Sequence, residues 1–338
     1  MLGGPTFRSR FRNYRSRIGV DSGFVPILPI TTLNNLGVKG NASRRVARNK
    51  NGAQSVERVD VMLLVPQTME SEFEGFSSGS EILTKHADRW RKVSFGVPVF
   101  DRLTGGGIGA RGIFELAGDP GSGKTQIALK LALTAQRTVP NSCVVYICTE
   151  HRFPSRRLLQ MEAEYKRQQS ADDAVRDHNF VDHILVEHVW CLPTLMACLF
   201  DRLPKLLEST KISMLIIDSI ASPFLEERDY ISRAETFRSI VHRLHQLQER
   251  HNFAICVTNQ VRSVIDSSTL DDQRNVPALG LAWSTLVHTR LQLSRTTLSS
   301  NDRRCTVVFG PSAPPKHGFY QIDESGPVDT EALRVSMS

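Results

Sequence analysis

The sequence has no long hydrophobic run and few cysteines for its length. No apolar stretch approaches the roughly 18 residues of a membrane-spanning helix, and the first residues lack the apolar core of a secretory signal. We therefore expect no membrane partner. The six cysteines are scattered, several of them in apolar strand-like runs, which predicts reduced, buried thiols instead of a disulfide framework. They are Cys143, Cys148, Cys191, Cys198, Cys256 and Cys305.

Acidic residues are almost absent from the first 50 positions. That segment has ten basic side chains against one acid, Asp21, so its net charge is +9, whereas the other 288 residues sum to −2. Arginine alternates there with serine and aromatic residues and no apolar stripe develops, which predicts a disordered basic arm over residues 1–65. Four roles stay open for the arm: a nucleic-acid-binding tail, a mitochondrial transit peptide, a nuclear address, or a solvated leader without a dedicated role.

After the arm, the pattern predicts one large folded domain. Residues 66–92 are polar and rich in glycine and serine, and they are interpreted as a linker that carries the aromatic anchors Phe73 and Phe76. Short apolar runs alternate with helical patterns over residues 93–330, and a tail follows at 331–338. Continuous apolar strands alternating with helices are typical of an α/β fold with a mainly parallel central sheet and helices on both faces.

The expected elements follow from apolar runs and their period. We predict parallel strands at 113–117, 144–148, 184–189, 213–218 and 253–259. We predict helices at 124–136, 154–166, from 193 onward and 232–250. The period changes to two at 284–294 and 305–309, which predicts an antiparallel C-terminal edge.

One turn between an apolar strand and a helix carries most of the chemistry. Residues 118–125 match G-x-x-x-x-G-K-[ST], the phosphate loop of nucleotide-binding proteins. Glycines let backbone N–H groups curl around phosphate oxygens, and the helix directs its positive end at the same anion. Lys124 is predicted to neutralise phosphate and Thr125 to bind Mg²⁺, so ATP and Mg²⁺ are the expected cofactors. The loop consists of Gly118, Asp119, Pro120, Gly121, Ser122, Gly123, Lys124 and Thr125.

Two acids are placed to complete such a site. Asp218 closes the apolar run 213–218, which should bring its carboxylate to the metal beside Thr125. Glu150 comes just after the run 144–148, at the edge of the sheet where open α/β folds bind ligands. It is the candidate base that orients water for hydrolysis.

Four motifs in order together resemble the ATPase core of RecA-type recombinases. They are "ELAGDPGSGKTQ", "VYICTEHRFPSRRL", "LIIDSIASPF" and "VTNQV". The narrower resemblance, carried by "YICTE", "EHV", "IDSIASPF" and "PALGLAW", is to eukaryotic recombinase paralogues of the X-ray-repair-complementing type that includes spindle-B. It covers about residues 73–328. The resemblance implies a RecA-like P-loop ATPase fold.

The resemblance also implies roles for individual residues. Glu150 corresponds to the water-orienting glutamate, and Arg157 in "PSRRL" to an arginine that stacks on adenine. Gln260 in "TNQV" corresponds to a glutamine that senses the γ-phosphate and relays it to a DNA-facing loop. Phe76 stands where these recombinases insert a phenylalanine into a neighbouring subunit, and Gly79 takes the place of the alanine three residues later.

The chain departs from the family pattern in three places. Residues 1–65 show no compact helical DNA-binding domain, and Gly310 occupies the place of an aspartate that reaches a neighbour's ATP. The two segments expected to face DNA, 225–233 and 261–280, sum to about −1 each. Phosphate neutralisation dominates DNA affinity, so we expect single-stranded DNA to be bound mainly as part of a complex.

The function implied is an accessory factor of homologous recombination and double-strand-break repair. It would have a weak, DNA-dependent ATPase activity and act with another recombinase paralogue, through the Phe76 segment, to support the strand-exchange recombinase on single-stranded DNA. The alternative is an ATP-gated structural adaptor with little hydrolysis; a ring-type motor is disfavoured by the acidic loops. We expect a nuclear location, with cytoplasm or mitochondrion as partial alternatives.

His242, His245 and His251 share one helix with polar neighbours and predict a solvated face, not a metal site.

Overall fold

The computed structural model describes residues 77–85, 91–169, 171–225, 227, 229–265, 273–296, 301–311 and 316–330. The chain divides into two units, Met1–Ser78 and Gly79–Ser338, and nearly all of the first lies outside the described residues. The basic arm therefore lies outside them, as do Phe73, Phe76 and the tail from residue 331. Among the residues that are described, no helix is both long and apolar enough to cross a bilayer.

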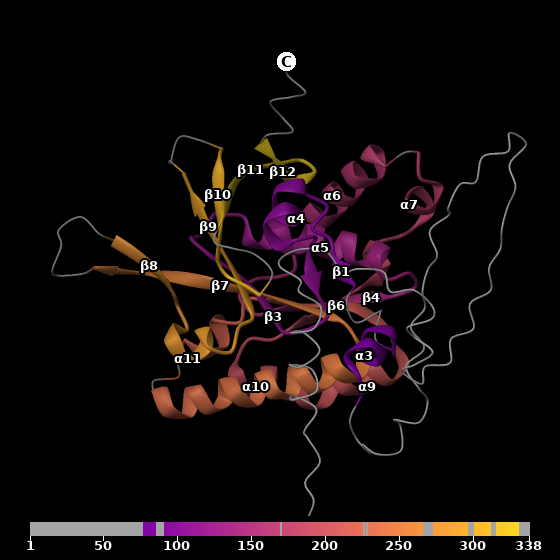
Figure 1. Cartoon of the computed structure of the whole chain (residues 1–338). Coiled ribbons are helices and arrows are strands. Elements are labelled where there is room, and N and C mark those ends of the chain that lie inside the picture. The colour runs from indigo at the N-terminus through magenta and orange to yellow at the C-terminus, as the bar shows by residue number, and fades with distance from the viewer. Residues whose placement is uncertain are drawn as a thin grey trace, which may run out of the picture. The chain divides into compact units, whose positions relative to one another are not determined.

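A mainly parallel sheet forms the centre of the second unit (Figure 1). Its strand order is β12-β11-β10-β9-β3-β7-β6-β4-β5, and β8 pairs with β7 outside this path. Six strands run parallel: β3 (Ile113–Gly118), β4 (Cys143–Cys148), β5 (Ile184–His188), β6 (Ile212–Asp218), β7 (Ala254–Ile265) and β9 (Thr289–Arg295). The strands β10 (Arg303–Phe309), β11 (His317–Asp323) and β12 (Gly326–Asp329) extend the sheet antiparallel from β9. This architecture confirms the predicted fold class.

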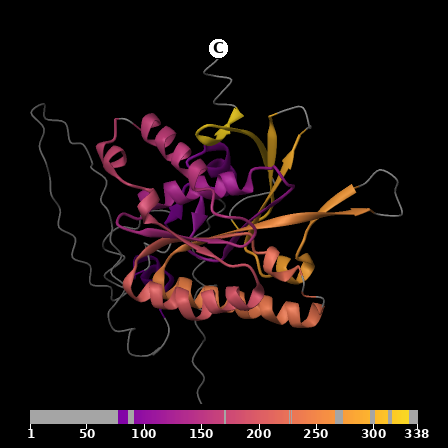
Figure 2. The same ribbon diagram turned by 180° about the vertical axis from the view of Figure 1, so that it is seen from behind.

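Helices cover both faces of the sheet, and a hydrophobic core fills the space on each side (Figures 1 and 2). One face is covered by α4 (Pro98–Thr104), α5 (Lys124–Thr138), α6 (Ser155–Gln168) and α7 (Asp173–Asp177). The other is covered by α8 (Leu192–Ala197), the π-helical turn η4 (Cys198–Arg202), α9 (Leu203–Ser209), α10 (Tyr230–His251) and α11 (Gly280–Ser284). The strands between them are buried on both sides, and for that reason they show continuous apolar runs.

Short elements complete the described chain. These are α3 (Gly79–Lys85), β1 (Lys92–Val93), β2 (Ile108–Gly109), η3 (Val181–His183), η5 (Ser222–Phe224) and β8 (Gln273–Pro277). β1 pairs antiparallel with β2, outside the main sheet. Within the segment 66–92, which was interpreted as a linker, residues 79–85 are thus helical.

Two local predictions were wrong. The alternation at 284–294 predicted one antiparallel strand, but α11 ends at Ser284, a turn follows, and β9 begins only at Thr289. β9 pairs parallel with β3 and antiparallel only with β10, because it lies at the boundary between the two halves of the sheet. The cysteines are all free, as expected, but Cys191 is exposed and Cys143 is partly exposed. Cys191 precedes α8 at the surface and does not belong to a strand.

Candidate nucleotide site

The loop between β3 and α5 has the backbone of an anion cradle. Gly121 (φ +74°) and Gly123 (φ +96°) adopt left-handed conformations that other residues rarely take. At Gly118 a Cβ would lie 2.3 Å from the main-chain oxygen of Leu293, so only glycine fits between the strands there. The predicted residues 118–125 therefore form one turn whose N–H groups precede a 15-residue helix.

Two side chains of this turn, those of Ser122 and Lys124, bear on how it would hold an anion. The Ser122 hydroxyl is buried without a hydrogen-bond partner in the described part of the chain, although its main-chain oxygen accepts a bond from Tyr320 Oη at 2.6 Å. Lys124 Nζ donates to the main-chain oxygens of Gly118 (2.8 Å) and Asp119 (3.0 Å). Burial lowers the pKa of Lys124, against the opposing effect of Asp218, Glu150 and Asp119. A half-buried cation beside a turn of N–H groups fits an anion such as a phosphate.

Asp218 lies at the end of β6 and is surrounded by hydroxyl groups. Its Oδ2 accepts hydrogen bonds from Thr125 Oγ1 (2.9 Å) and Tyr146 Oη (2.7 Å), and its Oδ1 accepts one from Thr258 Oγ1 (2.6 Å). Burial, and then the neighbouring Asp218, raise the pKa of Tyr146 well above its ordinary value, so this phenol stays a proton donor. The structure thus brings the two predicted metal residues, Thr125 and Asp218, into direct contact. A hydroxyl and a carboxylate are oxygen ligands of the kind that Mg²⁺ prefers.

Glu150 and Gln260 also meet, from neighbouring parts of the sheet edge. Gln260 Nε2 donates to Glu150 Oε1 at 2.8 Å, and Ser219 Oγ donates to the same oxygen. Gln260 lies in β7 beside Gly118 of β3 in the strand register, which places it next to the start of the phosphate loop. Two residues that are 110 positions apart in sequence therefore form one polar pair.

A cleft of about 600 Å³ lies at the carboxyl ends of the parallel strands. It is lined by five residues of the phosphate loop, including Lys124 and Thr125, and by Glu150, Asp218, Gln260, Arg157, Arg303 and Ile322. Open α/β sheets bind ligands at this edge. The described residues hold no group of three or more His, Cys, Asp or Glu side chains suited to a metal, so a divalent ion here would share its ligands with a phosphate.

Comparison with known proteins identifies the family. The Rad51 sequence profile matches residues 88–330. The DNA repair protein XRCC3 of Mus musculus is 31% identical over 263 residues, which is 71% of this chain and 75% of the relative; that of Bos taurus is 32% identical over 255 residues with the same coverage. The XRCC3 homolog of Arabidopsis thaliana is 27% identical over 294 residues, covering 73% of this chain and 95% of the relative.

The chain belongs to the Rad51 family. The resemblance proposed from the motifs, to recombinase paralogues of the X-ray-repair-complementing type, is confirmed: the chain is a Rad51 paralogue of the XRCC3 type. The Rad51 match ends at residue 330, the last residue of the described C-terminal edge, so it spans the whole sheet.

In this Rad51-family cleft, Arg157 lies at the rim and is already engaged. Its Nε donates to Gln126 Oε1 (2.8 Å), and its Nη1 donates to the main-chain oxygen of Glu324 (3.1 Å). Its Nη2 donates to the main-chain oxygen of Asp323. The guanidinium plane is therefore fixed between α5 and the β11–β12 turn, where a planar ligand could pack against it.

Sequence reasoning missed several residues of the site. Tyr146 and Thr258 position Asp218, and their strands β4 and β7 are the two neighbours of β6, so the strand order could have found them. Arg303 Nε donates to the main-chain oxygen of Gly121 at 3.2 Å, from the antiparallel edge. No local motif points to Arg303, because it reaches the loop only through the pairing of β9 with β3 and β10.

Other predicted functional residues lie outside this cleft or outside the described residues. Phe76 is not among the described residues, and Gly79 begins α3. Gly310 follows β10 and lines a separate depression of about 250 Å³. Of the segments expected to face DNA, residues 226, 228 and 266–272 are not described, nor are the side chains of 262–276.

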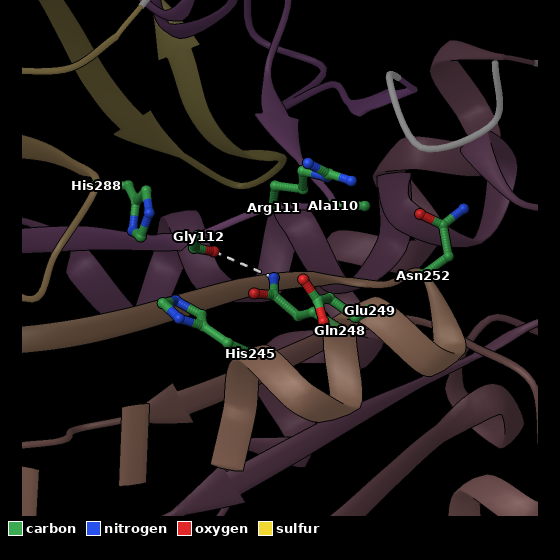
Figure 3. A pocket seen from close by; sticks show the side chains of 8 residues that line it. All are labelled: Ala110, Arg111, Gly112, His245, Gln248, Glu249, Asn252 and His288. Atoms are coloured by element: carbon green, nitrogen blue, oxygen red, sulfur yellow. Dashed lines mark hydrogen bonds between the residues drawn. The ribbon is translucent and has the colours of Figure 1, made fainter. Parts of the chain in front are cut away.

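The three histidines of α10 do not share one solvated face. His242 is exposed, but His245 is half-buried and faces His288 across a small pocket of about 170 Å³ (Figure 3). His288 Nδ1 accepts a bond from the Ile113 N–H at 3.3 Å, while His245 Nε2 is buried without a partner in the described chain. Burial, and then His288, lower the pKa of His245, and burial lowers the pKa of His288.

Proposed function

We propose that this protein is an ATP-binding accessory factor of homologous recombination. It acts with another recombinase paralogue to support the strand-exchange filament on single-stranded DNA during double-strand-break repair. The observation that carries the proposal is the cleft itself: the phosphate loop, the Thr125–Asp218 contact and the Glu150–Gln260 pair face one space. ATP with Mg²⁺ is the general ligand of the Rad51 family.

Each residue of the cleft has a task in this proposal. The N–H groups of the turn and Lys124 would hold the phosphates, and Thr125 with Asp218 would hold the Mg²⁺. The metal supplies charge neutralisation on the phosphate oxygens. Glu150 would accept a hydrogen bond from water and orient it. The Gln260 amide donates a hydrogen bond to Glu150 in this structure. In the presence of ATP it would donate to a phosphate oxygen instead.

The DNA part of the proposal is supported by the relatives and by charge. Three relatives are named DNA repair protein XRCC3 or its homolog. The segments 225–233 and 261–280 sum to about −1 each, so they offer little phosphate neutralisation by themselves. The +9 arm and a partner subunit supply the missing positive charge. A repair role of this kind places the protein in the nucleus, which imaging of the tagged full-length chain tests directly.

The Phe76 segment is proposed as the contact with the partner paralogue. Burying the phenylalanine in a neighbouring core would stabilise the complex by about 2–3 kcal/mol. The variant Phe76→Glu should therefore abolish co-purification with a co-expressed paralogue while leaving nucleotide binding intact. Ile82→Glu, in helix α3 further along the sequence, provides a control for an added charge. Undiminished co-purification of Phe76→Glu would exclude the segment as the main contact.

The variant Glu150→Gln tests whether nucleotide is hydrolysed or only held. The change keeps the size of the side chain and its bond to Gln260 but removes the carboxylate that orients water, so binding should persist while turnover falls about 100-fold or more. Turnover is measured on the complex with its partner, with and without single-stranded DNA. Glu164→Gln on the surface of α6 is the matched control. Equal turnover in the wild type and Glu150→Gln would favour the structural adaptor.

A further inference from the structure

A buried polar cluster around Glu115 connects the nucleotide cleft to two other parts of the fold. Glu115 lies in β3 with no exposed surface. Its Oε1 accepts hydrogen bonds from Asn259 Nδ2 (2.7 Å) and Trp283 Nε1 (2.8 Å), and its Oε2 pairs with the Arg290 guanidinium. Three side chains, from β7, α11 and β9, thus converge on one carboxylate in β3.

Stability alone gives a poor reason for this cluster. Asn259 and Trp283 are fully buried, Arg290 is 5% exposed, and two polar atoms, Asn259 Oδ1 and Arg290 Nη2, have no partner in the described chain. A buried ion pair is often no more stabilising than apolar residues of the same volume, and an unpaired buried polar atom is a net cost. The arrangement therefore points to a role in positioning.

The cluster is adjacent to the phosphate loop and to Gln260. In the strand register Ala117 pairs with Asn259 and Gly118 with Gln260, so Asn259 neighbours both the phosphate loop and the glutamine that contacts Glu150. The main-chain oxygen of Gln260 accepts a bond from the Ala278 N–H (2.8 Å), at the base of the β7–β8 hairpin.

The other two members of the cluster lie on the far side of that hairpin and on the C-terminal edge. Trp283 belongs to α11, which follows the hairpin, and its ring packs edge-on against Phe237 of α10 at 5.4 Å. Arg290 stacks over the ring of Phe309 at 5.0 Å, and Phe309 is the residue before Gly310. Asn259 is thus linked through the Glu115 carboxylate to Trp283 of α11 and to Arg290, which contacts the end of β10.

We propose that Glu115 is a positioning residue that couples Gln260 in the nucleotide cleft to α11 and to the end of β10. The coupling rests on the proposed nucleotide site. When Gln260 leaves Glu150 for a phosphate oxygen, β7 shifts against β3, and Glu115 transfers the shift to Trp283 and Arg290 through direct hydrogen bonds. Loss of the γ-phosphate reverses it.

Trp283 itself can report this coupling. The chain has three tryptophans, and the double variant Trp90→Phe, Trp190→Phe leaves Trp283 as the sole emitter. Its indole N–H is bonded to the Glu115 carboxylate, so its emission responds to movement of that charge. We expect a non-hydrolysable ATP analogue with Mg²⁺ to change the emission of Trp283. With ADP and Mg²⁺, the emission should equal that of the nucleotide-free protein. Identical emission with both nucleotides bound would overturn the proposal.

Removing the charge of Glu115 provides the second measurement. Glu115→Gln keeps the shape of the side chain but should reduce the preference for the ATP analogue over ADP about tenfold, a scale typical of coupling between sites. A merely structural role would change both affinities together and leave their ratio as it was. Glu162→Gln is the matched control, because Glu162 is also a buried glutamate that accepts a main-chain N–H (Phe180, 3.0 Å) but lies on α6, away from the cluster.

If Glu115→Gln does not fold, the ratio of the affinities for the ATP analogue and for ADP is measured on Trp283→Phe instead. This change removes only the indole N–H bond and keeps an aromatic ring against Phe237, and it should lower the ATP-over-ADP preference about threefold. Displacement of a fluorescent nucleotide is measured in parallel. Absence of any nucleotide binding overturns both this proposal and the proposed function, whereas binding with an unchanged ratio overturns only the role of Glu115.

Discussion

The two edges of the parallel sheet differ in how far their polar side chains are hydrogen-bonded. At the carboxyl edge, Asp218 has three hydroxyl partners and Glu150 is bonded to Gln260 and Ser219. At the amino edge, the pocket before β3, β7 and β9 leaves His245 Nε2 buried and unpartnered in the described chain, with His288 opposite. Groups that are held in fixed positions can act on a ligand without reorganising, whereas an unpartnered imidazole mainly adds a penalty on burial. The comparison therefore assigns the chemistry to the carboxyl edge.

The largest expected effect comes from breaking the carboxyl edge at Lys124. Lys124→Ala removes the cation that faces the turn and should weaken ATP binding roughly 100-fold, because hydrogen bonds to charged groups contribute about 1.5–3 kcal/mol. Nucleotide affinity is measured by displacement of a fluorescent analogue.

A lysine of the same helix provides the control for that change. Burial also lowers the pKa of Lys130, which lies 4.9 Å from the ring centroid of Tyr165 and outside the cleft. Lys130→Met keeps the apolar stem and should leave nucleotide affinity unchanged. Equal losses in the two variants would mean that buried lysines of α5 act through stability and not through the phosphate.

A smaller effect is expected when the support of Asp218 is weakened. Tyr146→Phe removes one of the two hydroxyls on Asp218 Oδ2 and frees the carboxylate to turn away from Thr125. Binding of ATP in the presence of Mg²⁺ should fall about tenfold, the lower end of what such supporting partners contribute, while binding in EDTA stays the same. Tyr165→Phe on α6 is the control, because its hydroxyl contacts only Arg137 among the described bonds. An equal fall with and without Mg²⁺ would remove the metal from the explanation.

How much of the site could be predicted depended on how far apart its residues lie in sequence. Residues 118–125 form a local motif, and Asp218 and Glu150 end apolar runs, so strand periodicity alone placed them at one edge. The supporting groups were not predicted, since Tyr146 and Thr258 look like ordinary strand residues until β4 and β7 are known to flank β6. Glu115 was not singled out, because its partners lie 144 to 175 positions away in sequence.

The fold shows the same limit. The strands β3, β4 and β6 were predicted close to their bounds because a strand buried on both faces is continuously apolar. β11 and β12 were missed, since an edge partly exposed to solvent mixes polar and apolar residues. The segment 284–294 was assigned to a single strand because its apolar residues recur with a period of two, although it spans the end of α11, a turn and β9.

The smallest effect is expected at the amino edge, where pH sharpens the comparison. The pKa of His245 is lowered in the folded protein, so below the ordinary histidine value of about 6.5 the unfolded chain binds a proton that the folded chain does not. Stability is then lost as pH falls through and below 6.5, while it is unaffected above that value. His245→Gln removes the titration and should reduce the drop in Tm between pH 7.5 and 5.5 by about 1–2 °C, a small amount because solvent screens a half-exposed ring. His242→Gln, exposed on the same helix and bonded to Gln246, should show the full wild-type drop. If the drop in Tm is as large in His245→Gln as in the wild type, the acid sensitivity arises from other residues. Burial of the unpartnered His245 imidazole would then not lower the stability of the folded protein at acid pH.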